Sequence, residues 1–224
     1  AELLKELGYD GAGHLWLDNL TERLDTLDRA GLRLFQVYLR LDVSPTAKEA
    51  YDPRLRVVLP LLKGRGTTLA TLMVGGKPSD DSLDSRAVDI VREIAGMAEL
   101  YGVRIALYHH TRDWLERVED AVRVAEKSRR PDVGVMFNLC HWLKVGDESR
   151  MRPLLEAVMP RLFGVSINGA DRSADIKSGK GNWIQPLDSG AFDIYSFLKT
   201  LKDLKYRGPI GLQCWGIPGD ARLH

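Results

Sequence analysis

Four of the five histidines follow short apolar segments, at positions where buried strands would end. His14 follows a glycine-containing segment, His109 and His110 follow a second, and His141 follows a third. Histidine is a common general base near neutral pH and the most common metal ligand. A single histidine of this kind is more often a hydrogen-bonded loop residue. Four at equivalent positions favour a functional site.

Further hydrogen-bonding side chains occupy the same kind of position. If every predicted strand ends at one rim, that rim also carries Tyr38, Arg40, Tyr108, Asn138, Ser166, Asn168, Asp171 and Gln213. Carboxamides donate and accept hydrogen bonds at once, as the hydroxyl groups of a sugar require. The indoles of Trp142, Trp183 and Trp215 lie near strand ends or in a long loop, where they could stack on a sugar ring or pack in the core.

The elements that position these residues alternate along the chain. The predicted strands are Tyr9–Leu15, Leu32–Leu41, Thr67–Val74, Val103–Leu107, Val133–Asn138, Phe163–Ile167 and Ile210–Cys214. The predicted helices are Ala1–Leu7, Asp18–Ala30, Pro53–Gly64, Ser85–Tyr101, Arg112–Arg129, Ser149–Leu162 and Phe192–Tyr206. Such alternation predicts a parallel sheet with helical crossovers. In α/β barrels, catalytic groups gather at the carboxyl ends of the strands.

The length indicates an incomplete barrel. An eight-stranded (β/α) barrel usually takes about 250 residues, whereas this chain has 224. We therefore predict one α/β domain over residues 1–224, a TIM-type (β/α) barrel without its first strand and last helix. The strands Tyr9–Leu15 and Ile210–Cys214 would then have unpaired edges, which recruit another chain. We expect a homodimer; the alternative is closure into a seven-stranded barrel.

The composition excludes several classes of protein. Lys and Arg total 32 against 31 Asp and Glu, so the net charge of +1 provides no field for a nucleic acid partner. The two cysteines, Cys140 and Cys214, form neither a disulfide framework nor a metal-ligand motif. No apolar segment approaches the roughly 18 residues of a membrane helix, and no signal peptide is visible. We expect a soluble protein without a membrane partner, cytoplasmic by default.

The succession of motifs resembles the xylose isomerase-like TIM barrels, which include sugar phosphate isomerases and epimerases. The motifs that carry the resemblance are YDGAGH, LYHHT, VGVMFNLCHWL, VSINGAD and WIQPLDSGAFDIYSFLKTLKDLKYRGPIGLQCWG. They span nearly the whole chain. Endonucleases that act on abasic DNA share this barrel type but use a richer set of metal ligands. The resemblance implies a (β/α) barrel that acts on a small carbohydrate.

The resemblance also implies a divalent metal, held by two Glu, one Asp and one His at four strand ends. Here the first Glu position falls at Tyr108, the Asp position at Asn138 and the last Glu position at Gln213. The histidine position falls near Ser166 or Asn168, and His141 matches the histidine of an Asp-x-x-His motif. Hard divalent cations prefer anionic oxygen ligands. We expect no cofactor; a zinc site formed by His14, His110 and His141 is the alternative.

The chemistry that depends least on a metal is proton abstraction next to a carbonyl. His110 or His141 would be the base, and Tyr108 or Lys180 the acid. The predicted substrate-binding residues are His14, Tyr38, Arg40, Asn138, Asn168, Asp171, Trp183 and Gln213. Isomerisation, epimerisation and β-elimination of a sugar or sugar phosphate all begin with this step. The alternative is a degenerate or truncated barrel that binds carbohydrate without turnover.

Overall fold

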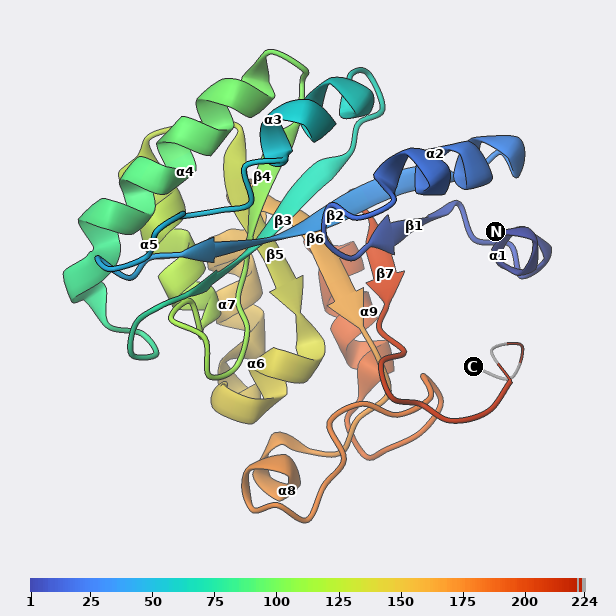
Figure 1. Ribbon diagram of the computed structural model, residues 1–224. Helices are drawn as coiled ribbons and strands as arrows, with labels where there is room; N and C mark the ends of the chain where they lie inside the picture. The colour runs from blue at the N-terminus through green and yellow to red at the C-terminus, as the bar shows by residue number, and fades with distance from the viewer. Residues whose placement is uncertain (221, 223–224) are drawn as a thin grey trace.

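The computed structural model describes residues 1–220 and 222, and its central feature is one sheet of seven parallel strands (Figure 1). In sheet order, which is also chain order, the strands are β1 (Gly11–His14), β2 (Arg33–Asp42), β3 (Thr68–Val74), β4 (Arg104–Tyr108), β5 (Val133–Asn138), β6 (Leu162–Ile167) and β7 (Ile210–Leu212). All six neighbouring pairs are parallel. The predicted TIM-type α/β fold and its seven strands are confirmed.

The sheet curls but does not close. β1 and β7 lie at its two ends, on either side of an opening, and within the described residues they do not pair with each other (Figure 1). The alternative of a closed seven-stranded barrel is therefore wrong for this chain. Both end strands are short, and each has a backbone edge that pairs with no other strand of residues 1–220.

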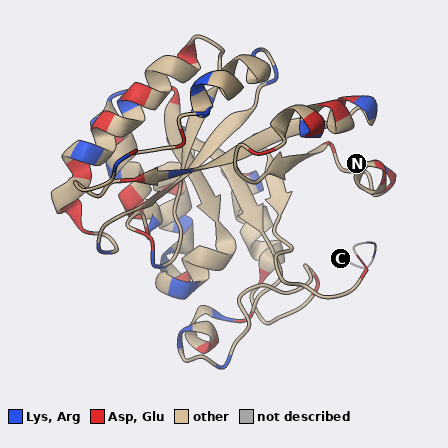
Figure 2. Cartoon of the chain, in the orientation of Figure 1, with Lys and Arg blue, Asp and Glu red and all other residues tan. Residues whose placement is uncertain are grey.

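Helices cover the outer face of the sheet. They are α2 (Leu20–Arg29), α3 (Leu55–Val58), α4 (Asp84–Glu99), α5 (Val118–Ser128), α7 (Met151–Val158) and α9 (Ile194–Asp203). On α4, the buried residues Ala87, Val91, Ile94 and Ala98 recur at intervals of three and four, which places them on one face. Charged residues lie along the outer helices, whereas the strands carry few (Figure 2). None of the helices in the described part of the chain is long and apolar enough to cross a membrane.

A second, smaller core fills the inside of the curled sheet. It consists of Ala70, Leu72, Ala106, Tyr108 and Met136, which alternate along β3, β4 and β5 with residues that face the helices. Small alanines on β3 and β4 leave room for the larger Tyr108 and Met136. Tyr108 thus belongs to the interior and, as the last residue of β4, also reaches the rim.

The connections differ from the sequence prediction more than the strands do. A short helix, α6 (Leu139–Val145), follows β5 without a loop, because the Asn138 side chain caps it by accepting a hydrogen bond from the His141 amide. The predicted helix Arg112–Arg129 begins only at Val118, after a turn in which Arg112 has φ 74°. The short helix α1 (Glu2–Glu6), before β1, lies within the predicted helix Ala1–Leu7. The short helix α8 (Ser173–Lys177), which was not predicted, interrupts the long loop after β6.

Candidate active site

A cavity of about 890 Å³ lies at the carboxyl ends of the strands and extends down the opening between β1 and β7. Residues of β1, β2, β4, β6 and β7, of α6 and of the loop that contains Trp183 line it. It brings together eight residues predicted from the sequence: His14, Tyr38, Arg40, Tyr108, His110, His141, Trp183 and Gln213.

Asn138 lies beneath this cavity rather than on its surface, and its side chain is fully buried. Its Nδ2 donates to the Tyr108 hydroxyl at 2.5 Å and to the Ser166 hydroxyl at 3.2 Å. Its Oδ1 accepts from the Cys140 thiol at 2.8 Å and from the His141 amide at 3.2 Å. Asn138 therefore orients Tyr108 and starts α6, and its carboxamide has no group left for a ligand.

Two phenols face the cavity as neutral hydrogen-bond donors. The Tyr38 hydroxyl accepts a hydrogen bond from Gln36 Nε2 at 2.7 Å, just as the Tyr108 hydroxyl accepts one from Asn138. Because each oxygen already accepts an amide N–H, its own proton is available to a ligand. Burial raises the pKa of Tyr38 to about 12 and that of Tyr108 well above its usual value. The rings meet edge to face, with centroids 5.4 Å apart.

His141 is a neutral donor as well. The Thr111 amide donates to its Nδ1 at 3.3 Å, so the neutral ring carries its proton on Nε2. Burial, together with the neighbouring His110, His109 and Lys144, lowers the pKa of His141 to about 2. Such an imidazole is a poor base near neutral pH, which leaves the other predicted base, His110, for that role.

His110 lies beside a carboxylate and faces the cavity. Its Nδ1 lies 3.3 Å from Oδ2 of Asp113, and its side chain is 36% exposed. Its ring centroid lies 3.9 Å from that of His141. Nδ1 of His110 and Oδ2 of Asp113 lie within ion-pair distance but do not form a hydrogen bond. Asp113 therefore places a carboxylate beside the ring of the candidate base. We did not predict Asp113 from the sequence, although its spacing three residues after His110 was a signal.

His109 points away from the cavity and supports the strand beside it. Its Nε2 accepts the Asn138 backbone N–H at 3.0 Å, which requires a neutral ring. Complete burial lowers the pKa of His109 to about 3.

Indole rings form one wall of the cavity. Trp183 and Trp215 lie with their centroids 6.4 Å apart, and Trp183 also contacts the ring of His141. Trp16, which was not predicted from the sequence, also lines the cavity. Cζ of Arg40 lies 5.1 Å from the centroid of the Trp16 ring. Its place two residues after His14 was the available signal. Trp142 is instead a core residue, packed against Phe137.

Besides Asn138, three other predicted site residues do not line the cavity. Asn168 is buried and donates to the Trp183 carbonyl at 2.9 Å, and Asp171 accepts from the Asn182 amide at 2.8 Å. Both therefore hold the loop that carries Trp183. Lys180 is exposed on that loop and does not line the cavity.

The donor set does not fit the divalent metal of related barrels. No three His, Cys, Asp or Glu side chains of the described residues come together to hold a metal ion. Oδ1 of Asn138 already accepts two hydrogen bonds, from the Cys140 thiol and the His141 amide. Nε2 of His14 forms a hydrogen bond with the Asp18 carbonyl oxygen at 2.7 Å. Tyr108 and Gln213 are neutral where anionic ligands would be needed.

Comparisons with known proteins agree with this architecture. Similar solved structures include the D-allulose 3-epimerase from Methylomonas sp., at 22% identity with a TM-score of 0.70, over 94% of this chain and 75% of that one. The 3-keto-D-glucoside 4-epimerase from E. coli has 16% identity and a TM-score of 0.71, over 97% and 86%. An AP endonuclease, family 2, from Brucella melitensis has 16% identity and a TM-score of 0.71, over 95% and 85%. No curated protein sequence matches the chain.

Sequence identities this low show that the fold is shared, but they do not show which reaction this chain catalyses. The family model of the xylose isomerase-like TIM barrel matches residues 1–223, nearly the whole chain. The resemblance read from the motifs is thereby confirmed, and the chain belongs to the xylose isomerase-like TIM barrel family.

Proposed function

We propose that the protein isomerises or epimerises a sugar or sugar phosphate in this cavity. The reaction would start with abstraction of the proton on the carbon next to a carbonyl. One observation carries the proposal: His110, backed by Asp113, faces the same cavity as the neutral donors Tyr38, Tyr108 and His141. A base and neutral donors in one partly dry cavity are what the formation of an enediolate needs. These side chains, rather than a metal, polarise the carbonyl.

The reaction begins when His110 Nε2 takes the proton from the carbon next to the carbonyl. The electrons of the C–H bond form a C=C bond, and the carbonyl oxygen becomes the enediolate oxygen. The hydroxyl of Tyr38 or Tyr108, or the Nε2–H of His141, donates to that oxygen. To complete an isomerisation, His110 returns its proton to the former carbonyl carbon, and the hydroxyl proton of the neighbouring carbon moves to the enediolate oxygen, so that the carbonyl forms again at that neighbouring carbon. To complete an epimerisation, Tyr108 gives its proton to the opposite face of the first carbon and the carbonyl forms again. His110 then releases the proton it took to solvent, and solvent returns a proton to the Tyr108 phenolate, which restores the site.

The rest of the cavity fits a carbohydrate. Trp183 and Trp215 offer apolar ring faces to the C–H groups of a sugar, while Gln213 and His14 offer polar groups to its hydroxyls. Arg40 is the only Lys or Arg among the lining residues, so it is the group that would bind a phosphate. Two of the similar structures are named as epimerases of sugars, which supports this substrate class.

Hydrogen exchange in D₂O tests the proposal without knowledge of the final product. Ketohexoses, ketopentoses and their phosphates are incubated with the protein, and ¹H NMR follows the signal of the carbon-bound proton next to the carbonyl. We expect exchange with at least one of them, and a rate at least about 100-fold lower for His110→Gln, the usual contribution of a general base. Glu119→Gln, a change on the exposed face of α5, is the control and should exchange at the normal rate.

The alternative is a barrel that binds carbohydrate without turnover. Binding of a sugar by calorimetry, with no exchange in the unmodified protein, would reject the isomerase proposal in favour of this one. Equal exchange by the unmodified protein and by His110→Gln would reject the role of His110.

We also propose that two copies associate through the opening between β1 and β7. Four of the large apolar side chains that are exposed line the cavity at this opening: Leu15, Trp16, Ile210 and Trp215. A two-fold contact would cover these side chains, occupy both strand edges and close the side of the cavity.

A further inference from the structure

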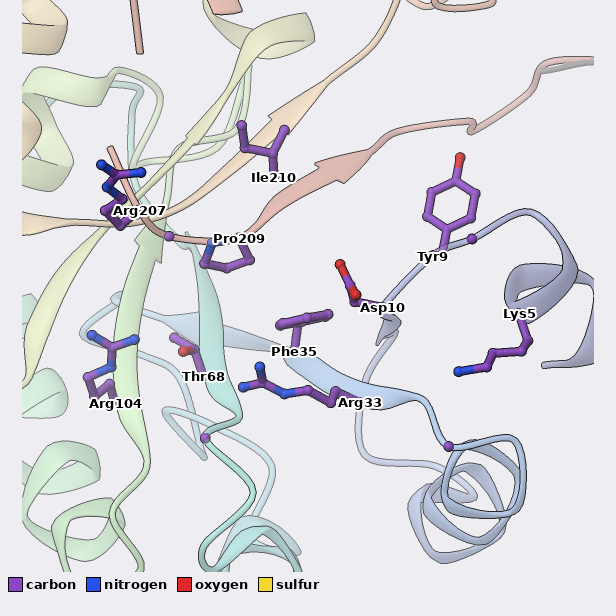
Figure 3. A pocket seen from close by; sticks show the side chains of 14 residues that line it. Lys5, Tyr9, Asp10, Arg33, Phe35, Thr68, Arg104, Arg207, Pro209 and Ile210 are labelled. Carbon is purple, nitrogen blue, oxygen red and sulfur yellow. The ribbon is translucent and has the colours of Figure 1, made fainter. Parts of the chain in front are cut away.

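A second cavity, of about 950 Å³, lies at the opposite, amino ends of the strands (Figure 3). Arg33, Thr68 and Arg104 are the first residues of β2, β3 and β4, and all three line it. Arg207 and Pro209, just before β7, line its other side. The two cavities share Asp10 and Phe35, among other residues, so they adjoin along the opening of the barrel.

The cations of this cavity lack anionic partners. Arg33, Arg104 and Arg207 come from three separate elements, and none forms an ion pair with a residue that the structure describes. Some arginines elsewhere are ion-paired, as between Arg65 and Asp28 at 2.8 Å and between Arg130 and Asp132 at 2.7 Å.

Two of the guanidinium groups are held in place without their donors being used. Cζ of Arg104 lies 4.3 Å from the ring centroid of Phe163, and Cζ of Arg33 lies 4.8 Å from that of Phe35. Packing against a ring fixes a guanidinium while its N–H groups stay free to bind phosphoryl oxygens. Nη2 of Arg33 reaches close to the turn before β3, since a Cβ at Gly66 would lie 3.3 Å from it.

Asp10 is the single carboxylate among the lining residues, against Lys5 and the three arginines. Asp10 makes no side-chain hydrogen bond or ion pair with any described residue; only its backbone carbonyl is used, by the Arg33 amide at 2.9 Å. The cavity therefore has an uncompensated positive charge. Thr68 and Tyr9 add neutral hydroxyl groups to its lining.

We propose that this cavity binds a small polyanion with at least two phosphoryl groups. The three arginines come from separate parts of the chain, and together they can balance more negative charge than a single phosphate carries. Because Arg33 belongs to a strand paired with β1 and Arg207 precedes β7, the anion would link the two sides of the opening. Binding would thereby stabilise the folded chain, as any ligand specific for the native state does.

Inorganic pyrophosphate is the probe, titrated by calorimetry and in thermal melts at constant ionic strength and constant protein concentration. We expect a saturable rise in melting temperature, and tighter binding of pyrophosphate than of inorganic phosphate. Arg104→Gln and Arg207→Gln should each weaken binding at least threefold. Arg23→Gln, which removes an arginine of α2 that lies outside the cavity, should bind as the unmodified protein does.

The variant Asp10→Asn distinguishes a direct effect on anion binding from an indirect effect of a damaged fold. It removes the only opposing charge, so pyrophosphate should bind at least threefold more tightly, a gain that misfolding cannot produce. An equal melting shift with sodium chloride would overturn the proposal. So would equal affinity for phosphate and pyrophosphate, unchanged binding by both arginine variants, or weaker binding by Asp10→Asn.

Discussion

At the scale of single residues, two buried imidazoles make the stability of the fold depend on pH. Burial lowers the pKa of His109 to about 3 and that of His141 to about 2, below the value of about 6.5 in an unfolded chain. Between pH 7 and pH 5 the unfolded state therefore binds protons that the folded state does not. The free energy of unfolding should fall by roughly 2 kcal/mol per histidine over this range.

Urea unfolding at pH 7, 6 and 5, at one protein concentration, measures this effect. His141→Gln should lose about half of the pH dependence, because one of the two titrating groups is gone. The carboxylates with lowered pKa values titrate below this window and do not disturb the comparison. Equal stability of the unmodified protein at pH 7 and pH 5 would contradict the assignment.

The sequence was enough to predict which residues lie at the cavity, but only partly what each of them does there. Position at a strand end was enough to predict that Tyr108, His110 and His141 share a cavity. It could not predict that Asn138 is covered, because this depends on hydrogen bonds to β4 and β6, which are distant in sequence. Asp113 was missed because it lies in a turn where a helix was expected.

At the scale of elements, the loop between β6 and α9 depends on one glycine. Gly169 pairs with Gln185, and a Cβ at Gly169 would lie 1.8 Å from the Pro186 carbonyl oxygen. Gly169→Ala should therefore displace this loop and move Trp183 out of the cavity. Loss of one stacked indole should weaken sugar binding about tenfold, with a shift in tryptophan fluorescence.

Gly164→Ala, on the strand β6 that precedes this loop, is the matched control. Its Cβ would lie 3.6 Å from Cγ of Met136, an ordinary contact, so binding and fluorescence should stay as they are. Equal sugar affinity for both variants would show that the loop does not contribute to the site.

The strands were easier to predict than the connections for a physical reason. A buried parallel strand is a short apolar segment bounded by turns, and that pattern is local. The first residues of α6 and α5 instead depend on particular hydrogen bonds to side chains: the His141 amide donates to Asn138 Oδ1, and the Arg117 amide donates to Asp120 Oδ2. Such caps can be recognised only once the neighbouring backbone is placed.

At the scale of the whole molecule, the open side of the barrel is where association should occur. Ile210 is 45% exposed on β7 and Leu15 is 60% exposed just after β1, next to two strand edges that have no partner in the described chain. Light scattering at low micromolar concentration should give twice the chain mass of 25.1 kDa.

Ile210→Lys places a charge in the contact and should give the mass of a single chain. Leu100→Lys is the control, since Leu100 is 74% exposed at the end of α4, away from the opening, and should leave the dimer intact. A single-chain mass for the unmodified protein, with a melting temperature independent of its concentration, would show that the two strand edges stay free of a second copy.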